Sequence, residues 1–80
     1  MKIPRDLSGR ELADRLCKVW DYREVKQTGS HIILQTETPS HQRLPIPAHK
    51  PVKVGTLSAI ARQVARHKGV TREDVLVSIL

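Results

Sequence analysis

Aromatic side chains, cysteines and long apolar runs are all scarce in this 80-residue chain. It has one Trp, one Tyr and no Phe, so it offers few rings on which nucleic-acid bases could stack. Its single cysteine, Cys17, can form no intrachain disulfide and lies in no zinc-site spacing. The longest apolar runs are three residues, far short of the roughly 20 that span a bilayer. These absences argue against secretion, membrane insertion and a zinc site, and they predict a cytoplasmic protein.

The length limits the chain to one small domain, which we expect to span residues 1–80. Its content of 39% hydrophobic and 28% charged residues is typical of a folded soluble domain. A thin core leaves little room to enclose a large cofactor, and no glycine-rich phosphate loop occurs. We therefore expect a shallow site that needs neither a cofactor nor a metal ion.

Acidic residues are absent between Glu37 and Glu73, although that stretch holds seven Lys or Arg residues and three His residues. Most of the net charge of +6 therefore arises in the second half of the chain. A positive surface of this kind favours binding of nucleic-acid phosphates or of an acidic protein. The alternative is a solvated basic face that only aids solubility.

Local signals predict the order helix, three strands, helix and a short last helix, which is an α+β fold. Ser8 and Glu11 form a capping box for the first helix. Its apolar stripe reaches to about residue 19 and comprises Leu12, Ala13, Leu16, Val19 and Trp20. The predicted strands span Tyr22–Gln27, Ser30–Thr36 and His41–Ile46.

The second helix has the strongest periodic signal in the chain, after a surface loop over Pro47–Gly55. Its end is predicted at Lys68 and Gly69, and Thr71 is expected to cap the last helix. The apolar positions of the second helix are Leu57, Ile60, Ala61, Val64 and Ala65.

A three-stranded antiparallel sheet needs cover, so we expect the helices to pack on one of its faces. Strand alternation places Ile32 and Leu34 together, facing the helices, and His31 on the solvent side. Ile33 favours the opposite assignment, which stays open at this point. The third strand should turn Leu44 and Ile46 inward and should be an edge strand, because its prolines cannot donate to a ladder.

Histidines beside cations are the chemical feature that remains once metal and thiol chemistry are set aside. Cys17 lies near a helix end whose dipole disfavours a thiolate, so a core thiol is expected. Imidazole can move a proton near neutral pH, and Lys or Arg can neutralise a phosphate. These residues would support metal-independent phosphodiester cleavage. A histidine beside a turn, such as His31, can equally serve only a structural role.

Three motifs in one order resemble the HicA (YcfA-like) toxin family. They are Gly29-Ser30-His31 at the head of a strand, Ile46-Pro47-Ala48-His49-Lys50, and Gly55-Thr56-Leu57 at the start of an amphipathic helix. The resemblance extends from the first helix to Gly69. The sequence departs from the family pattern at Asp21-Tyr22 and at Ile32, and it continues through a further capped helix.

The resemblance implies a double-stranded-RNA-binding-domain-like α-β-β-β-α fold. It also implies a ribonuclease that cleaves messenger RNA and is neutralised by a HicB-type antitoxin. Under this resemblance His31 is the catalytic residue. Lys50 and Lys53 are then candidates for stabilising the charged transition state, and His49 is a weaker candidate for a second proton carrier.

The remaining RNA-binding predictions are Ser30 beside the catalytic residue and Arg62 and Arg66 on the polar side of the second helix. Solvated loop lysines are the alternative for Lys50 and Lys53. A non-catalytic module that binds duplex RNA or an acidic protein is the alternative for the whole chain.

Overall fold

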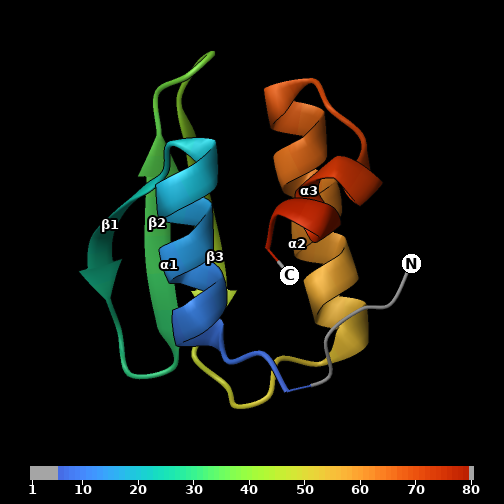
Figure 1. Ribbon diagram of the computed structural model, residues 1–80. Helices are drawn as coiled ribbons and strands as arrows, with labels where there is room; N and C mark the ends of the chain where they lie inside the picture. The colour runs from blue at the N-terminus through green and yellow to red at the C-terminus, as the bar shows by residue number, and fades with distance from the viewer. Residues whose placement is uncertain (1–5, 80) are drawn as a thin grey trace.

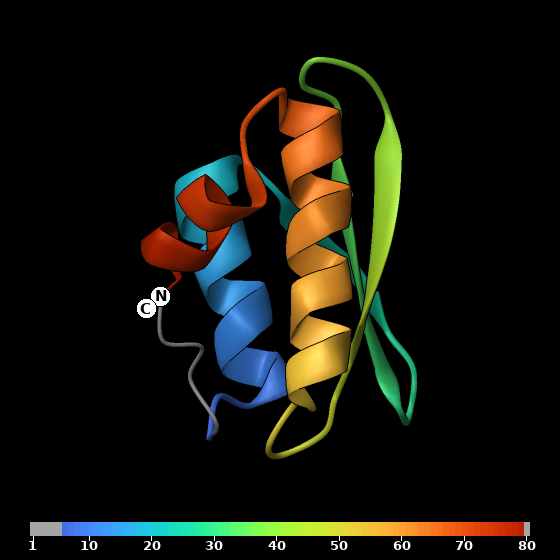
Figure 2. The ribbon, with the colours of Figure 1, turned by 90° about the vertical axis from the view of Figure 1, so that its right-hand side faces the viewer.

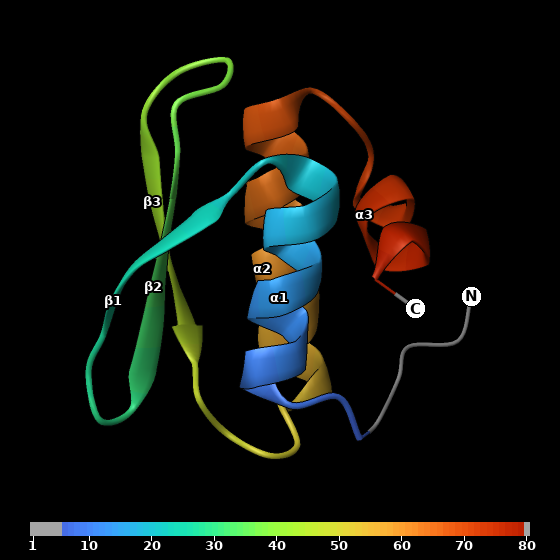
Figure 3. The ribbon, with the colours of Figure 1, turned by 60° about the vertical axis from the view of Figure 1, so that its left-hand side comes forward.

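The computed structural model describes residues 6–79 of the chain. The elements follow in the order α1 (Gly9–Trp20), β1 (Arg23–Gln27), β2 (His31–Thr36), β3 (Gln42–Pro47), α2 (Val54–Lys68) and α3 (Arg72–Ser78) (Figure 1). The strands form one antiparallel sheet in the order β1-β2-β3, and the helices lie on one side of it (Figure 3). The predicted α+β class and element order, with the short last helix, are confirmed.

Two predictions about the whole chain stay predictions. The expected domain span of 1–80 includes residues 1–5 and 80, which lie outside the described residues. The likeness to a double-stranded-RNA-binding domain also stays a prediction. Over residues 6–79, the helices are too short or too polar to cross a bilayer.

Helix α1 begins at the predicted capping box: Glu11 N–H donates to Ser8 Oγ (3.1 Å), and the Glu11 carboxylate accepts from the Ser8 backbone. Leu12, Ala13 and Leu16 are buried. The prediction for Val19 is wrong, since its side chain is 49% exposed. At about 100° per residue the buried arc is centred between Leu16 and Trp20, so Val19 lies at its margin.

The register of the sheet settles which strand residues face the helices. Ile32 and Leu34 on β2 and Leu44 and Ile46 on β3 are all buried, whereas His31 is exposed, as predicted. Strand β3 is an edge strand, also as predicted. The predicted starts of all three strands are one residue too early, and the predicted end of β3 is also one residue too early. Tyr22, just before β1, packs in the core.

Helix α2 buries the five predicted apolar residues, and Gly69 ends it with a φ of 73°, a left-handed conformation that glycine adopts without strain. Strand β3 includes Pro47 and the helix begins at Val54, so the loop spans residues 48–53, the predicted loop is too long by three residues, and Gly55 lies in the first turn of α2. Thr71 caps α3 as predicted. Figure 2 shows α2 running beside β3.

Candidate active site

The start of β2, the end of β3 and the first turn of α1 meet at one end of the domain (Figure 3). Backbone hydrogen bonds hold them there: Ala48 N–H donates to Ser30 O, and Gly9 N–H donates to His49 O, both at 2.9 Å. A Cβ on Gly9 would lie 1.9 Å from Pro47 O, so only glycine permits this approach. The loop over residues 48–53 is thereby fixed beside the first residue of β2.

His31 is exposed at this end of the sheet, and its backbone and ring are both held. Its N–H donates to Thr28 Oγ1 (3.2 Å), and its carbonyl accepts from Thr28 N–H (2.9 Å). Ring atom Nδ1 lies 3.0 Å from Ser30 Oγ. Among the described residues, Nε2 has no hydrogen-bond partner. A reactant could therefore meet Nε2 while Ser30 holds the other ring nitrogen.

The loop after β3 brings further positive charge to the same end. His49, Lys50 and Lys53 are all exposed, and Lys53 is the N-cap residue of α2. Lys53 makes no side-chain capping hydrogen bond among the residues that the structure describes, and the first turn of α2 carries no acidic residue. The positive end of the helix dipole therefore adds to the lysine charges.

The sequence predictions did not include the uncapped N-terminus of α2. Its signal is a lysine at a position where Ser, Thr, Asp or Asn is preferred. The structure thus brings Ser30, His31, His49 and Lys50 to one end of the domain, the cluster around His31, and Lys53 follows where the loop enters α2.

Arg62 and Arg66 lie elsewhere. Both are exposed on α2 and line a hollow of about 570 Å³ beside Gln42, at the start of β3. Gln42 pairs with Thr36, at the opposite end of β2 from His31. The rise of a strand separates these two ends by roughly 17 Å. The two arginines are therefore not part of the cluster around His31.

Comparison with known proteins identifies the family. The sequence model described as HicA toxin of bacterial toxin-antitoxin matches residues 9–65, which is well over half of the chain. The chain belongs to the HicA toxin family. No curated protein and no solved structure gives a significant match. The matched residues of this HicA family member include every residue of the His31 end and stop before α3.

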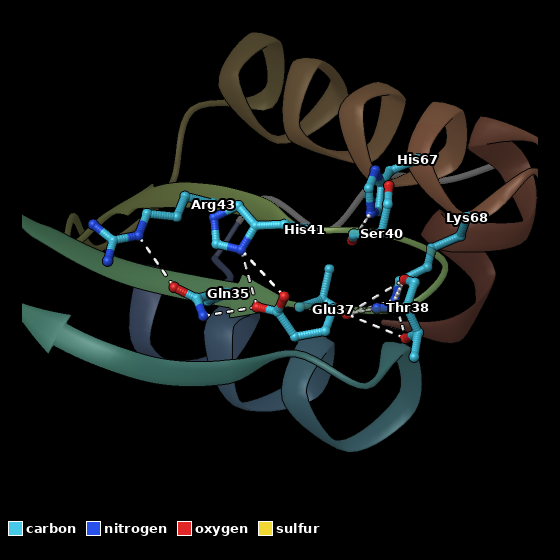
Figure 4. A network of polar contacts seen from close by, with 9 residues as sticks. Gln35, Glu37, Thr38, Ser40, His41, Arg43, His67 and Lys68 are labelled. Carbon is cyan, nitrogen blue, oxygen red and sulfur yellow. Dashed lines mark hydrogen bonds and ion pairs between the residues drawn. The ribbon is translucent and has the colours of Figure 1, made fainter.

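In this HicA family member, the end of the domain opposite His31 is a network of polar contacts (Figure 4). Lys68 Nζ donates to Thr36 Oγ1 (2.9 Å) and Thr38 O (2.6 Å) and lies 4.9 Å from the centre of the Tyr22 ring. Burial lowers the pKa of Lys68. This lysine therefore joins the end of α2 to the turn after β2 and is not free for an RNA phosphate.

Two histidines of the acid-free stretch belong to the same network. His67 Nε2 lies 2.8 Å from Ser40 O, and His41 Nδ1 lies 3.0 Å from the Glu37 carboxylate. The hydrogen bond from His41 lowers the pKa of Glu37. Both rings hold the turn between β2 and β3, so they do not contribute to the cluster around His31.

Cys17 packs against the core and is partly buried, as expected for a structural thiol. Burial raises the pKa of the thiol, which disfavours the nucleophilic thiolate. Among residues 6–79, no group of three His, Cys, Asp or Glu side chains is placed to hold a metal ion.

Proposed function

We propose that this HicA toxin is an endoribonuclease that cleaves messenger RNA without a metal ion and uses His31 to move a proton. The observation that carries the proposal is the state of the His31 ring, with Nδ1 beside Ser30 and Nε2 without a partner among the described residues. This arrangement stands at the end of the domain that also carries loop lysines and a free helix N-terminus.

The reaction uses the RNA's own 2′-hydroxyl as the nucleophile. Its oxygen forms a bond to the adjacent phosphorus while the bond from phosphorus to the 5′-oxygen breaks. A base must take the 2′ proton, and an acid must give one to the leaving oxygen. His31 would do one of these, and His49 is the candidate for the other. General acid–base help of this kind is typically worth about 10²- to 10⁴-fold in rate.

Negative charge accumulates on the phosphorane-like transition state. Lys50, Lys53 and the N-terminus of α2 would stabilise that charge. The support for this role is that both lysines are exposed on the loop that a backbone hydrogen bond joins to Ser30. Ser30 would contact the RNA beside the scissile phosphate and orient the His31 ring. Arg62 and Arg66 would contact phosphates farther along the strand, beyond the loop.

A HicB-type antitoxin is the proposed protein partner. The net charge of +6 and the acid-free stretch suit a partner that presents acidic side chains. An antitoxin that covers His31 or the lysines of residues 48–53 would block the access of RNA.

The test uses purified protein and two single-stranded oligonucleotides of one base sequence. One is RNA, and the other carries 2′-deoxy sugars throughout. We expect fragments from the all-ribose strand in the presence of EDTA, and none from the deoxy strand, which lacks the nucleophile. Cleavage that EDTA abolishes would refute the metal-free mechanism. Binding of both strands without fragments would instead support a non-catalytic binding module.

A further inference from the structure

The face of the sheet away from the helices forms three rows of side chains that include His31. The register sets the rows, because directly paired residues share a face. Along β2 these residues alternate with the buried ones. From the far end to the near end, the rows are Arg23, Gln35 and Arg43; then Lys26, Ile33 and Pro45; then His31 and Pro47.

A bulge in β1 places two cations on this face. Arg23 and Lys26 are three residues apart, which in a regular strand would put them on opposite faces. The register shifts between Glu24 and Lys26, so Arg23 and Lys26 both pair with residues of the open face. Glu24 instead bonds Arg10 of α1, on the helix side.

The cations of this open face are free to meet an anion. Arg23, Lys26 and Arg43 are exposed, and among residues 6–79 none of them forms an ion pair. Arg43 Nε donates only to the amide oxygen of Gln35 (3.1 Å), which orients the guanidinium without neutralising it. Glu37, the acid that acts on Arg23 through space, also accepts from Gln35 and lies 3.0 Å from His41 Nδ1. The far and middle rows therefore carry three cations against this one acid, and the near row holds His31.

The edges of the sheet do not favour the addition of a partner strand. The hydrogen bond from Ala48 N–H to Ser30 O fixes which residues of β3 face β2, and it leaves Pro45 and Pro47 on the outward positions, where neither has an N–H to offer. The other edge is interrupted by the bulge. A ligand of this region is thus expected on the face and not along an edge.

We propose that single-stranded RNA crosses this open face on one side of the scissile phosphate. Lys26, Arg43 and Arg23 would bind its phosphates, and Ile33 and Pro45 would lie beneath the bases. The far row lies four residue steps along β2 from His31, a distance of roughly 14 Å. A stacked strand, with a charge about every 3.4 Å, would place at most about four phosphates over that span. The loop of residues 48–53 would hold the strand on the other side of His31.

This inference rests on the proposed function, but its test measures binding and needs no cleavage. The probe is a single-stranded RNA of about 12 nucleotides with 2′-O-methyl sugars, which cannot be cut. The variants are Lys26→Gln and Arg43→Gln, singly and together. Each lost phosphate contact should reduce the slope of log K against log salt by about 0.7, so the double variant should lose about 1.4.

Lys18→Gln is the matched control, because Lys18 is exposed on α1, away from the open face. Its slope should remain that of the wild type, and all variants should melt like the wild type. An unchanged slope in the double variant would overturn the proposal. If the double variant bound RNA normally but no longer bound the antitoxin, the proposal would also be overturned, because the face would then be a protein interface. A reduced slope in a protein that never cuts RNA would support the face and refute the nuclease.

Discussion

The hydroxyl of Ser30 lies 3.0 Å from Nδ1 of His31, and it can either accept from Nδ1–H or donate to Nδ1. If Nδ1–H donates to Ser30 Oγ, Nε2 keeps its lone pair and can act as a base. If the hydroxyl donates to Nδ1, Nε2 carries the proton. In the proposed reaction Ser30 is therefore a positioning residue for His31.

We expect Ser30→Ala to reduce kcat about two- to tenfold, which is the net value of one hydrogen bond of about 0.5–1.5 kcal/mol. The fall is expected because the imidazole loses the partner that orients it. Ser30→Thr keeps the hydroxyl and should restore the wild-type kcat. A wild-type kcat in Ser30→Ala would show that the hydroxyl does not orient the ring.

The loop lysines provide a second prediction at this scale. Replacing Lys50 and Lys53 together by Ala should weaken RNA binding and reduce its salt slope by about 1.4, since two phosphate contacts are lost. The comparison variant is Arg62→Ala/Arg66→Ala, whose residues lie toward the other end of the domain and should have a smaller effect. Equal effects of the two pairs would remove the distinction between the near and distant sites.

At the scale of elements, the contact of α1 with the loop after β3 depends on one glycine. A Cβ on Gly9 would collide with a backbone oxygen, which cannot turn away as a side chain can. Gly9→Ala should therefore cost about 1–3 kcal/mol of stability, as overpacking does. It should also reduce cleavage, because the loop that carries Lys50 would move.

Gly55→Ala is the control for that prediction. Its added Cβ would have no atom within 4 Å, and alanine favours a helix over glycine by up to about 1 kcal/mol. Thermal melting should therefore show a lower Tm for Gly9→Ala and an equal or higher Tm for Gly55→Ala. A wild-type Tm for Gly9→Ala would contradict the close approach of α1 to the backbone of Pro47.

The packing of α2 provides another prediction for an element. Ile60 and Val64 are 4% and 0% exposed and face the core. Truncating either to Ala should cost about 1 to 4 kcal/mol, a large part of the stability of so small a domain. Exposed Val54, 43% accessible in the same helix, is the control, and its replacement by Ala should leave the Tm nearly unchanged. Equal melting of the Val64 and Val54 variants would contradict the packing of α2.

At the scale of the whole molecule, the sequence predicted what depends on local signals. Capping boxes, the stripe of α2 and strand alternation are short-range patterns, and they gave the element order and the orientation of Ile32 and His31. The family resemblance proposed His31, and position in the loop before the second helix proposed Lys50 and Lys53. These roles stay predictions, while a backbone hydrogen bond joins the start of that loop to Ser30, beside His31.

The errors and omissions arise where tertiary contacts decide. Val19 fits the helical period but lies at the edge of the arc that the sheet covers. The approach of Gly9 to Pro47 joins segments far apart in the chain, so no local pattern marks it. Arg23 and Lys26 share a face only because β1 is bulged, whereas simple alternation separates them.

In the proposed mechanism His31 moves a proton and does not hold the substrate. The most direct test measures RNA cleavage and RNA binding on one preparation of His31→Ala. The exposed ring loses little packing on truncation, so the variant should keep the wild-type Tm and RNA affinity. Cleavage should fall by about 10²- to 10⁴-fold. A folded His31→Ala protein that cuts RNA at the wild-type rate would contradict the claim.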